Sequence, residues 1–186
     1  VAFCPVSLRE AGDTGTGTKV SAVFVHLGQH EATAVERIRQ VVAAMGTAKQ
    51  EMRSMSKDAA MTYAVSLLGV AELTTKTRVD RVAPPLANMV ISNVPGVRER
   101  MYLNGAPLVG IYPVSALAMS IGLNVTLTSC HDRMDFGFVG NSATLRDVPE
   151  LARHVGEAYE ELKAAASKRR SAKGRARSAR RKSAGK

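Results

Sequence analysis

The sequence has no tryptophan, few aromatic residues and few cysteines. Aromatic residues make up 4% of the chain, and the two cysteines are Cys4 and Cys130. This pair has no metal-ligand spacing and gives no disulfide framework, which favours a reducing compartment such as the cytoplasm. No apolar run approaches the roughly eighteen residues that predict a membrane-spanning helix. These absences argue against a disulfide-stabilised secreted domain and against a helical membrane domain.

Recognisable catalytic motifs are also missing. Gly12 and Gly17 have the separation of a phosphate-binding loop, but Thr18 stands where that loop needs lysine. The segment also leads into an expected strand, so no helix N-terminus follows to hold a phosphate. No Gly-x-Ser-x-Gly elbow of a serine hydrolase occurs. A flexible connecting loop is the better interpretation of the glycine-rich segment.

The four histidines offer no convincing base or metal site. His26 and His30 are separated by an expected strand end, so they do not share a helical face, and His154 lies on the last expected helix with no partner in view. His131 and Asp135 have a His-x-x-x-Asp spacing, but it crosses an expected hairpin turn. We therefore predict surface or packing histidines, no catalytic residue and no metal site in this chain.

What the sequence does contain is a highly uneven charge distribution. The net charge is +10, yet residues 168–186 hold ten Lys and Arg and no acidic residue, while residues 1–167 hold sixteen basic and sixteen acidic residues. A segment of Lys, Arg, Ala, Ser and Gly buries too little apolar surface to offset its ordering entropy. We predict a folded domain over residues 1–166 and a disordered basic tail over residues 167–186.

Three functions fit this tail. It can be a solubilising end, it can bind anionic membrane lipids, and it can bind nucleic acid without sequence preference. No aromatic residue is interleaved with its charges, which argues against stacking on single-stranded nucleic acid. The composition leaves the three alternatives open, and of the two binding partners an anionic membrane surface is favoured over nucleic acid.

Hydrophobic periodicity predicts strands and then helices in the first half. Residues 2–8 and 19–27 are expected strands, the second apolar on both faces as in a buried central position. Apolar residues at helical spacing predict a helix over 31–55. A second helix is expected from an N-cap at Ser56 to about Val82, where Pro84 and Pro85 follow.

The second half is mostly β. Residues 122–130 and 133–140 alternate apolar and polar residues and form a hairpin around His131 and Asp132, residue types that tolerate a left-handed conformation. A final helix is expected over 147–166. The other expected strands are 87–93, 101–103 and 107–112. This order predicts an α+β fold, a mixed sheet with flanking helices.

Several motifs specify backbone without offering a catalyst. In "ISNVPG" we expect Pro95 and Gly96 to set the backbone of a corner and Asn93 to bond its own turn. "YLNGAPLVGIYPVS" then ends at Ser115. In "GLNVTLTS", alternation places Asn124 and Thr126 on the face opposite Leu123.

These motifs, together with "MDFGFVG", "CPVSLRE" and "AKQEMRSMS", occur in the order and spacing of a known family. Over about residues 1–165 the chain resembles the C-terminal domain of the bacterial wax ester synthase/diacylglycerol acyltransferase family. The resemblance implies one half of a fold like chloramphenicol acetyltransferase, in which two related halves pack around a channel. The opening "VAFCPVSL" likewise predicts a chain that begins within a fold.

The resemblance also implies where the chemistry lies. The family's His-His-x-x-x-Asp-Gly motif belongs to the N-terminal half, and its second His takes the proton from an alcohol that attacks an acyl-CoA thioester. These 186 residues do not contain that motif. We therefore expect this chain alone to be inactive, to bind no cofactor, and to need acyl-CoA as co-substrate of the complete enzyme.

For this half the resemblance implies a role in shaping the acyl and acceptor channel. The candidates for that channel are Asn124, Thr126 and Ser115, although the first two could equally face solvent or another strand. The chain departs from the family's pattern at Val97, at residues 116–121 ("ALAMSI") and at residues 141–142 ("NS"). These departures bear on the preferred acceptor.

The expected function is that of the C-terminal domain of a long-chain acyl-CoA-dependent O-acyltransferase that makes triacylglycerol or wax esters. Its expected partners are the N-terminal half, long-chain acyl-CoA and either diacylglycerol or a fatty alcohol. The alternative is a non-catalytic lipid- or partner-binding module with the tail as an electrostatic anchor. Either protein is expected in the cytoplasm, with the tail available for contact with membranes or lipid inclusions.

Overall fold

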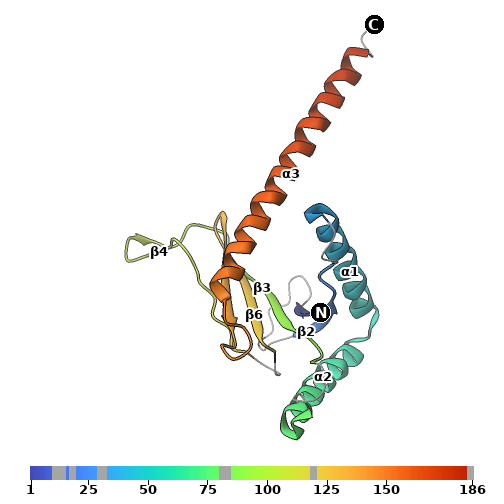
Figure 1. Ribbon diagram of the computed structural model, residues 1–186, viewed down its shortest axis with the longest axis vertical. Coiled ribbons are helices and arrows are strands. Elements are labelled where there is room, and N and C mark those ends of the chain that lie inside the picture. The colour runs from blue at the N-terminus through green and yellow to red at the C-terminus, as the bar shows by residue number, and fades with distance from the viewer. Residues whose placement is uncertain (10–15, 17–19, 29–32, 80–84, 118–120, 184–186) are drawn as a thin grey trace.

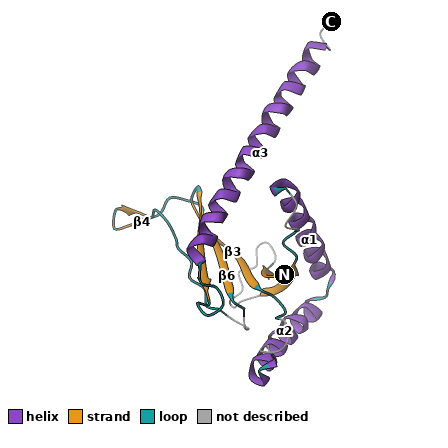
Figure 2. Cartoon of the chain, viewed as in Figure 1, coloured by secondary structure: helices purple, strands orange, loops and turns teal. Residues whose placement is uncertain are grey.

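The protein is described here from a computed structural model of residues 1–186. The description covers all of them except residues 10–15, 17–19, 29–32, 80–84, 118–120 and 184–186. The described residues form a five-stranded sheet, helices packed against it, and a separate two-stranded hairpin (Figures 1 and 2).

The sheet is mixed, with the strand order β2-β1-β3-β6-β7. β1 is antiparallel to β2 and parallel to β3, β3 is parallel to β6, and β6 is antiparallel to β7. Its strands are β1 Ala2–Ser7, β2 Val20–Val25, β3 Met89–Val97, β6 Leu123–Cys130 and β7 Arg133–Gly140. The predicted α+β class with a mixed sheet is confirmed.

Two helices connect β2 to β3, and both begin at recognisable caps. α1 spans Ala34–Ser54, and the Thr33 side chain accepts a hydrogen bond from the Glu36 N–H while the Glu36 carboxylate accepts one from the Thr33 N–H. α2 spans Lys57–Thr77, and the Ser56 hydroxyl accepts the Ala59 N–H at 3.2 Å. The predicted N-cap at Ser56 is therefore confirmed.

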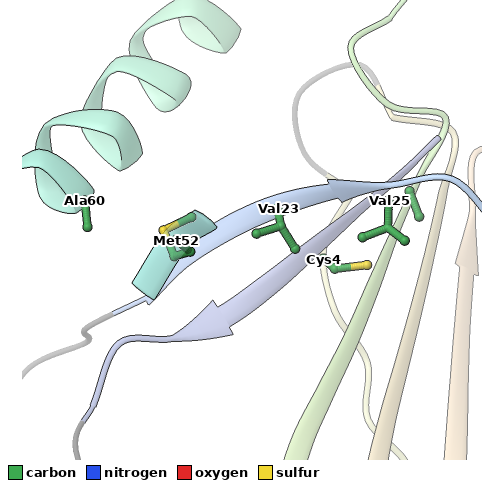
Figure 3. Packing of buried hydrophobic residues seen from close by; sticks show 6 residues of the cluster. Cys4, Val23, Val25, Met52 and Ala60 are labelled. Atoms are coloured by element: carbon green, nitrogen blue, oxygen red, sulfur yellow. The ribbon is translucent and has the colours of Figure 1, made fainter. Parts of the chain in front are cut away.

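The main core lies between the sheet and these two helices. Cys4 of β1 with Val23 and Val25 of β2 packs against Met52 of α1 and Ala60 of α2 (Figure 3). The last helix, α3 (Val148–Ser183), contacts both β7 and α1, so all three helices lie on one face of the sheet. Phe3, Phe24 and Val90 lie on the opposite face, in a second and smaller cluster.

The position predicted for residues 19–27 is wrong. β2 is an edge strand, although Ser21, Ala22, Val23 and Val25 are buried. Helices α1 and α2 cover one of its faces, and Phe24 packs edge-to-face with Phe3 on the other, with ring centroids 5.7 Å apart. Both faces of β2 are therefore buried by side chains packed above and below the sheet, and this burial does not require a neighbouring strand on each side of β2.

The predicted corner at Asn93 to Gly96 is a bulge inside β3. Val94 pairs with Thr128 and Val97 with Cys130, so β3 contains one more residue than β6 over this stretch. A Cβ on Gly96 would lie 1.9 Å from the Ser129 carbonyl oxygen. Glycine is needed here for close approach of two strands, not for the positive φ expected of a corner.

Two predicted boundaries also differ from the structure. α2 ends at Thr77, five residues before Val82, because Arg78 adopts a left-handed conformation with φ of 57°. The expected end at Val82 lies outside the described residues. Of the strand predicted over 107–112, only Pro107 is in a strand: β4 (Tyr102–Leu103) and β5 (Ala106–Pro107) pair with each other, and residues 108–112 are not strand.

The final helix is longer than predicted. It continues from the expected end at residue 166 through the basic tail to Ser183, and this distal part projects away from the sheet as a rod (Figure 1). The segment is rich in Ala, Lys and Arg, which favour helix when the backbone has no competing contacts. Residues 167–183 are thus helical in the structure, whereas their composition predicts disorder. The predicted boundary between a folded domain and a tail at residue 166 stays a prediction.

Candidate functional site

The most unusual feature of the sheet is a row of buried polar side chains on the face that the helices leave open. Asn124, Thr126 and Thr128 alternate along β6, and Asp135 lies opposite Thr128 on β7. Ile91 packs toward the helices and pairs with Val125, so the intervening residues of β6 face the other way. Buried polar groups need hydrogen-bond partners, and a chain segment on this face supplies them to Asn124, Thr126 and Asp135.

That segment is residues 108–116, which we call the strap. The Thr126 hydroxyl donates to the Asn124 Oδ1 at 2.8 Å, and its oxygen lies 2.8 Å from the Ser115 Oγ. Because Thr126 has a single hydroxyl proton, Ser115 must be the donor in the second bond. Asn124 in turn donates through Nδ2 to the Ala116 carbonyl at 3.3 Å. A closed polar network therefore joins β6 to the end of the strap.

The beginning of the strap is held by β7. The buried Asp135 carboxylate accepts the Ile111 N–H at 2.8 Å, and Arg133 donates to the Val109 carbonyl at 3.1 Å. Arg133 also lies 3.8 Å from Asp135 and keeps its charged group largely in solvent. These bonds occupy backbone groups that a paired strand would use, which explains why residues 108–112 do not form the predicted strand.

Between the two anchors the strap touches the sheet directly. A Cβ on Gly137 of β7 would lie 1.7 Å from the Pro113 carbonyl oxygen. Any residue other than glycine at 137 would lift the strap away from the sheet.

Anchoring forces the strap to present its alternate side chains outward. Ile111, Pro113 and Ser115 are partly buried, whereas Tyr112 and Val114 are 72% and 85% exposed. An apolar side chain held outward by a fixed backbone is available to contact an apolar ligand or another protein surface. The strap is thus a preorganised apolar surface supported by a polar network.

The three predicted channel residues come together, but beneath this surface. Ser115, Thr126 and Asn124 bond to one another and to the strap backbone, and none of these neutral groups is a base at neutral pH. Their contact with a substrate stays a prediction. Asn93 and Pro95 lie exposed in β3, and the described residues include no hydrogen-bond partner for the Asn93 side chain in its own turn.

Sequence reasoning missed the roles of Arg133, Asp135 and Gly137, and it considered Asp135 only for its spacing from His131. Asp135 interrupts an otherwise apolar or glycine-containing strand, "MDFGFVG", and is buried, which is a signal that its carboxylate has a fixed partner. That signal does not say which backbone group the partner is. The partner lies 24 residues away in sequence.

The described histidines lie at the surface, as predicted, but His154 has partners that the sequence analysis did not expect. His131 has φ of 56° in the hairpin turn and bonds Asp132 through Nδ1 at 3.0 Å, not Asp135. This hydrogen bond lowers the pKa of the Asp132 carboxyl. His154 lies between Glu150 and Glu157 on α3, at 3.2 Å from each. His26 is exposed, and His30 lies outside the described residues.

No metal site and no membrane-spanning helix are found in the part of the chain that the structure describes. Its His, Cys, Asp and Glu side chains form no group of three that could hold an ion. Its helices include none that is both long and apolar enough to cross a bilayer. Most of the Gly12 to Lys19 segment lies outside the described residues.

Comparison with known proteins identifies the family. Residues 16–163 match the model of the WS/DGAT C-terminal domain. A Mycobacterium tuberculosis protein whose name assigns it as a diacylglycerol O-acyltransferase is 37% identical over 168 residues, which is 89% of this chain and 34% of the relative. A Mycobacterium bovis protein with the same assignment is 36% identical over 163 residues, 87% of this chain and 34% of its own.

A solved structure agrees. The wax ester synthase/diacylglycerol acyltransferase from Marinobacter aquaeolei VT8 superposes with a TM-score of 0.68 at 31% identity, over 89% of this chain and 37% of that one. The chain spans about a third of the length of the curated relatives it matches. By sequence and by fold, the chain belongs to the WS/DGAT C-terminal domain family.

Proposed function

We propose that this chain acts as the C-terminal domain of a long-chain acyl-CoA-dependent O-acyltransferase that makes triacylglycerol or wax esters. Family membership and the names of its relatives support the reaction class. In this proposal the catalytic base comes from the region of the relatives that the chain does not cover. The base deprotonates the acceptor alcohol, whose oxygen attacks the acyl-CoA thioester and releases the thiol of CoA.

The observation that carries the proposal for this chain is the anchored strap. Tyr112 and Val114 project from a backbone held by Asp135 at one end and by Thr126 and Asn124 at the other. We propose that these two side chains form part of the wall along which an acyl chain or acceptor lies. The buried polar groups keep that wall in position, since each lost anchor would leave a buried polar atom without a partner.

The rest of the acyltransferase is the proposed partner for the remaining exposed apolar surface. The β4–β5 hairpin projects from the sheet (Figure 2), and Leu103 at its end is 83% exposed. A two-stranded ribbon is marginally stable in water on its own. Coverage by a second domain removes this apolar surface from water.

A graft tests the proposal. The matched segment of the Marinobacter aquaeolei enzyme is replaced by this chain, and acyl transfer from palmitoyl-CoA to diacylglycerol and to hexadecanol is measured. We expect turnover from the graft and none from the 186-residue chain alone. Val114→Asp in the graft should lower kcat/KM at least about tenfold, because it places a charge on an apolar wall. Thr47→Asp, at an exposed position of α1, is the matched control.

Three outcomes would contradict the proposal. Turnover by the isolated chain that survives replacement of all four histidines would reveal an unrecognised base within it. A folded graft that binds lipid but transfers no acyl group would favour the alternative, a non-catalytic lipid- or partner-binding module. Equal activity of the Val114→Asp and Thr47→Asp grafts would remove the strap from the substrate path.

A further inference from the structure

The distal part of α3 is a second surface that the acyl-transfer proposal leaves without a role. Residues 168–186, the basic segment, contain ten Lys and Arg and no Asp or Glu. The proximal part of α3 differs in sequence, because acidic residues occur among its basic ones. Arg153 bonds both Glu150 and Glu157, and Lys163 bonds Glu160 at 3.1 Å. The sequence of α3 thus changes at residue 168 from a mixture of acidic and basic residues to basic residues without acidic ones.

Geometry keeps the positive charge away from the acidic residues of the body. α3 runs without interruption to Ser183, and its distal part projects beyond the sheet (Figure 1). The stretch from Lys168 to Ser183 spans roughly 24 Å at about 1.5 Å per residue. Screening in physiological salt acts over about 8 Å, so acidic residues of the body have little effect on the cations near the far end of the helix.

Composition then restricts how this surface can bind. The basic segment contains no apolar residue larger than alanine and no aromatic residue. It therefore has no large apolar side chains to insert into a bilayer and no aromatic rings to stack on nucleic acid bases. Binding must be electrostatic, to a surface of dense negative charge.

We propose that the basic segment docks the enzyme on anionic membrane lipids. The choice of lipid over nucleic acid rests on the proposed function, because the acyl acceptors and products of that reaction partition into lipid. Adsorption through a projecting helix holds the sheet and its strap close to the surface from which such substrates come. The segment acts by charge alone, so the docking is reversible and salt-sensitive.

The test uses the 186-residue chain and sedimentation with two kinds of vesicle, one of phosphatidylcholine and one containing phosphatidylglycerol. We expect binding to the anionic vesicles only, and at least about a tenfold loss of binding between roughly 0.05 and 0.5 M salt. The variant Arg175→Gln/Arg177→Gln/Arg180→Gln/Arg181→Gln should lower binding at least about tenfold, since each cation near an anionic surface contributes.

A matched control separates position from net charge. Arg39→Gln/Arg53→Gln/Arg98→Gln/Arg100→Gln removes four exposed arginines from the body and changes the net charge equally. It should bind anionic vesicles nearly as well as the original chain. Equal losses in the two variants would mean that net charge, and not the basic segment, drives adsorption, and would overturn the proposal.

Nucleic acid is the competing outcome. A random DNA duplex is offered to the same variants in a mobility-shift assay. DNA binding with no binding to anionic vesicles would overturn the proposal in favour of nucleic acid. Vesicle binding is measured without catalysis, so the two proposals can fail separately. A graft that transfers no acyl group but binds vesicles through the basic segment would refute acyl transfer and leave the docking proposal standing.

Discussion

Single residues decide how the strap meets the sheet. Asp135 supplies a carboxylate to the Ile111 N–H, Thr126 passes a hydrogen bond from Ser115 to Asn124, and Gly137 leaves room for the Pro113 carbonyl. Each of these residues is of a common type, and none of them alone indicates a functional site. Their effect comes from being placed on one face of two adjacent strands.

Gly137 provides the most direct test at this scale. Gly137→Ala should lower the free energy of unfolding by about 1–3 kcal/mol, because overpacking forces the strap from the sheet. Urea unfolding measures this change. Gly46→Ala in α1 is the control, since a Cβ added there would meet nothing within 4 Å beyond the backbone of its own helix; it should stabilise the fold by about 0.5–1 kcal/mol. An unchanged stability in Gly137→Ala would show that the strap does not rest on β7 in solution.

Among the elements, helices are defined by local signals and the strap is not. α1 begins at a capping box and α2 at the Ser56 cap, and β6 and β7 meet in a turn where His131 has positive φ. Each signal lies within a few residues of the feature that it determines. The strap has the composition of a strand, but its partners lie on two other strands.

The α1 cap predicts a pH dependence. Hydrogen bonds from the Thr33 side chain and backbone lower the pKa of Glu36 from its ordinary value of 4.5. A carboxyl whose pKa is lowered by folding stabilises the helix above the unfolded value and loses that effect as the pH falls through the folded value. The first turn of α1 should therefore fray below about pH 4.5.

Amide exchange at the start of α1 measures this fraying. Glu36→Gln should remove most of the pH dependence there, because its amide does not titrate in this range. Glu51→Gln, which removes a carboxylate from the same helix outside the cap, should leave the profile of the first turn unchanged. A first turn equally protected at about pH 3 and about pH 7, on either side of the ordinary pKa of Glu, would show that the cap does not form.

At the scale of the whole molecule, the described chain exposes more apolar side chains than a free domain should. Val65 and Leu73 of α2 are each 61% exposed, and Val109 of the strap is 68% exposed. Large exposed apolar patches in water mark surfaces that bind another protein or ligand. This exposure agrees with a chain that matches about a third of its relatives' length.

We expect the isolated chain to self-associate or to bind an apolar fluorescent dye, because its uncovered apolar surface is in contact with water. Sedimentation velocity and dye fluorescence measure the two effects. In the Marinobacter graft the same segment should bind much less dye, since a second domain covers it. A monodisperse isolated chain without dye binding would favour an independent binding module over a domain of a larger enzyme.

Sequence alone determined the parts of this protein that depend on local patterns. Alternation predicted the β6–β7 hairpin at 122–130 and 133–140, and the cap at Ser56 located the start of α2. The linked motifs identified the family that the comparisons then confirmed. These features could be predicted because periodicity, capping and turn residues act over a few positions.

Tertiary structure decided what depends on distant partners. β2 is an edge strand although its sequence is apolar on both faces. Its side chains are buried because helices cover one face and Phe3 packs against the other. Residues 108–116 form a strap because the Asp135 and Asn124 side chains, rather than a neighbouring strand, bond their backbone. Sequence alternation and the family motifs predicted Ser115, Thr126 and Asn124 as channel candidates. Their bonds to one another form only because the strap crosses the sheet. A periodic sequence pattern does not encode which distant backbone a buried side chain will contact.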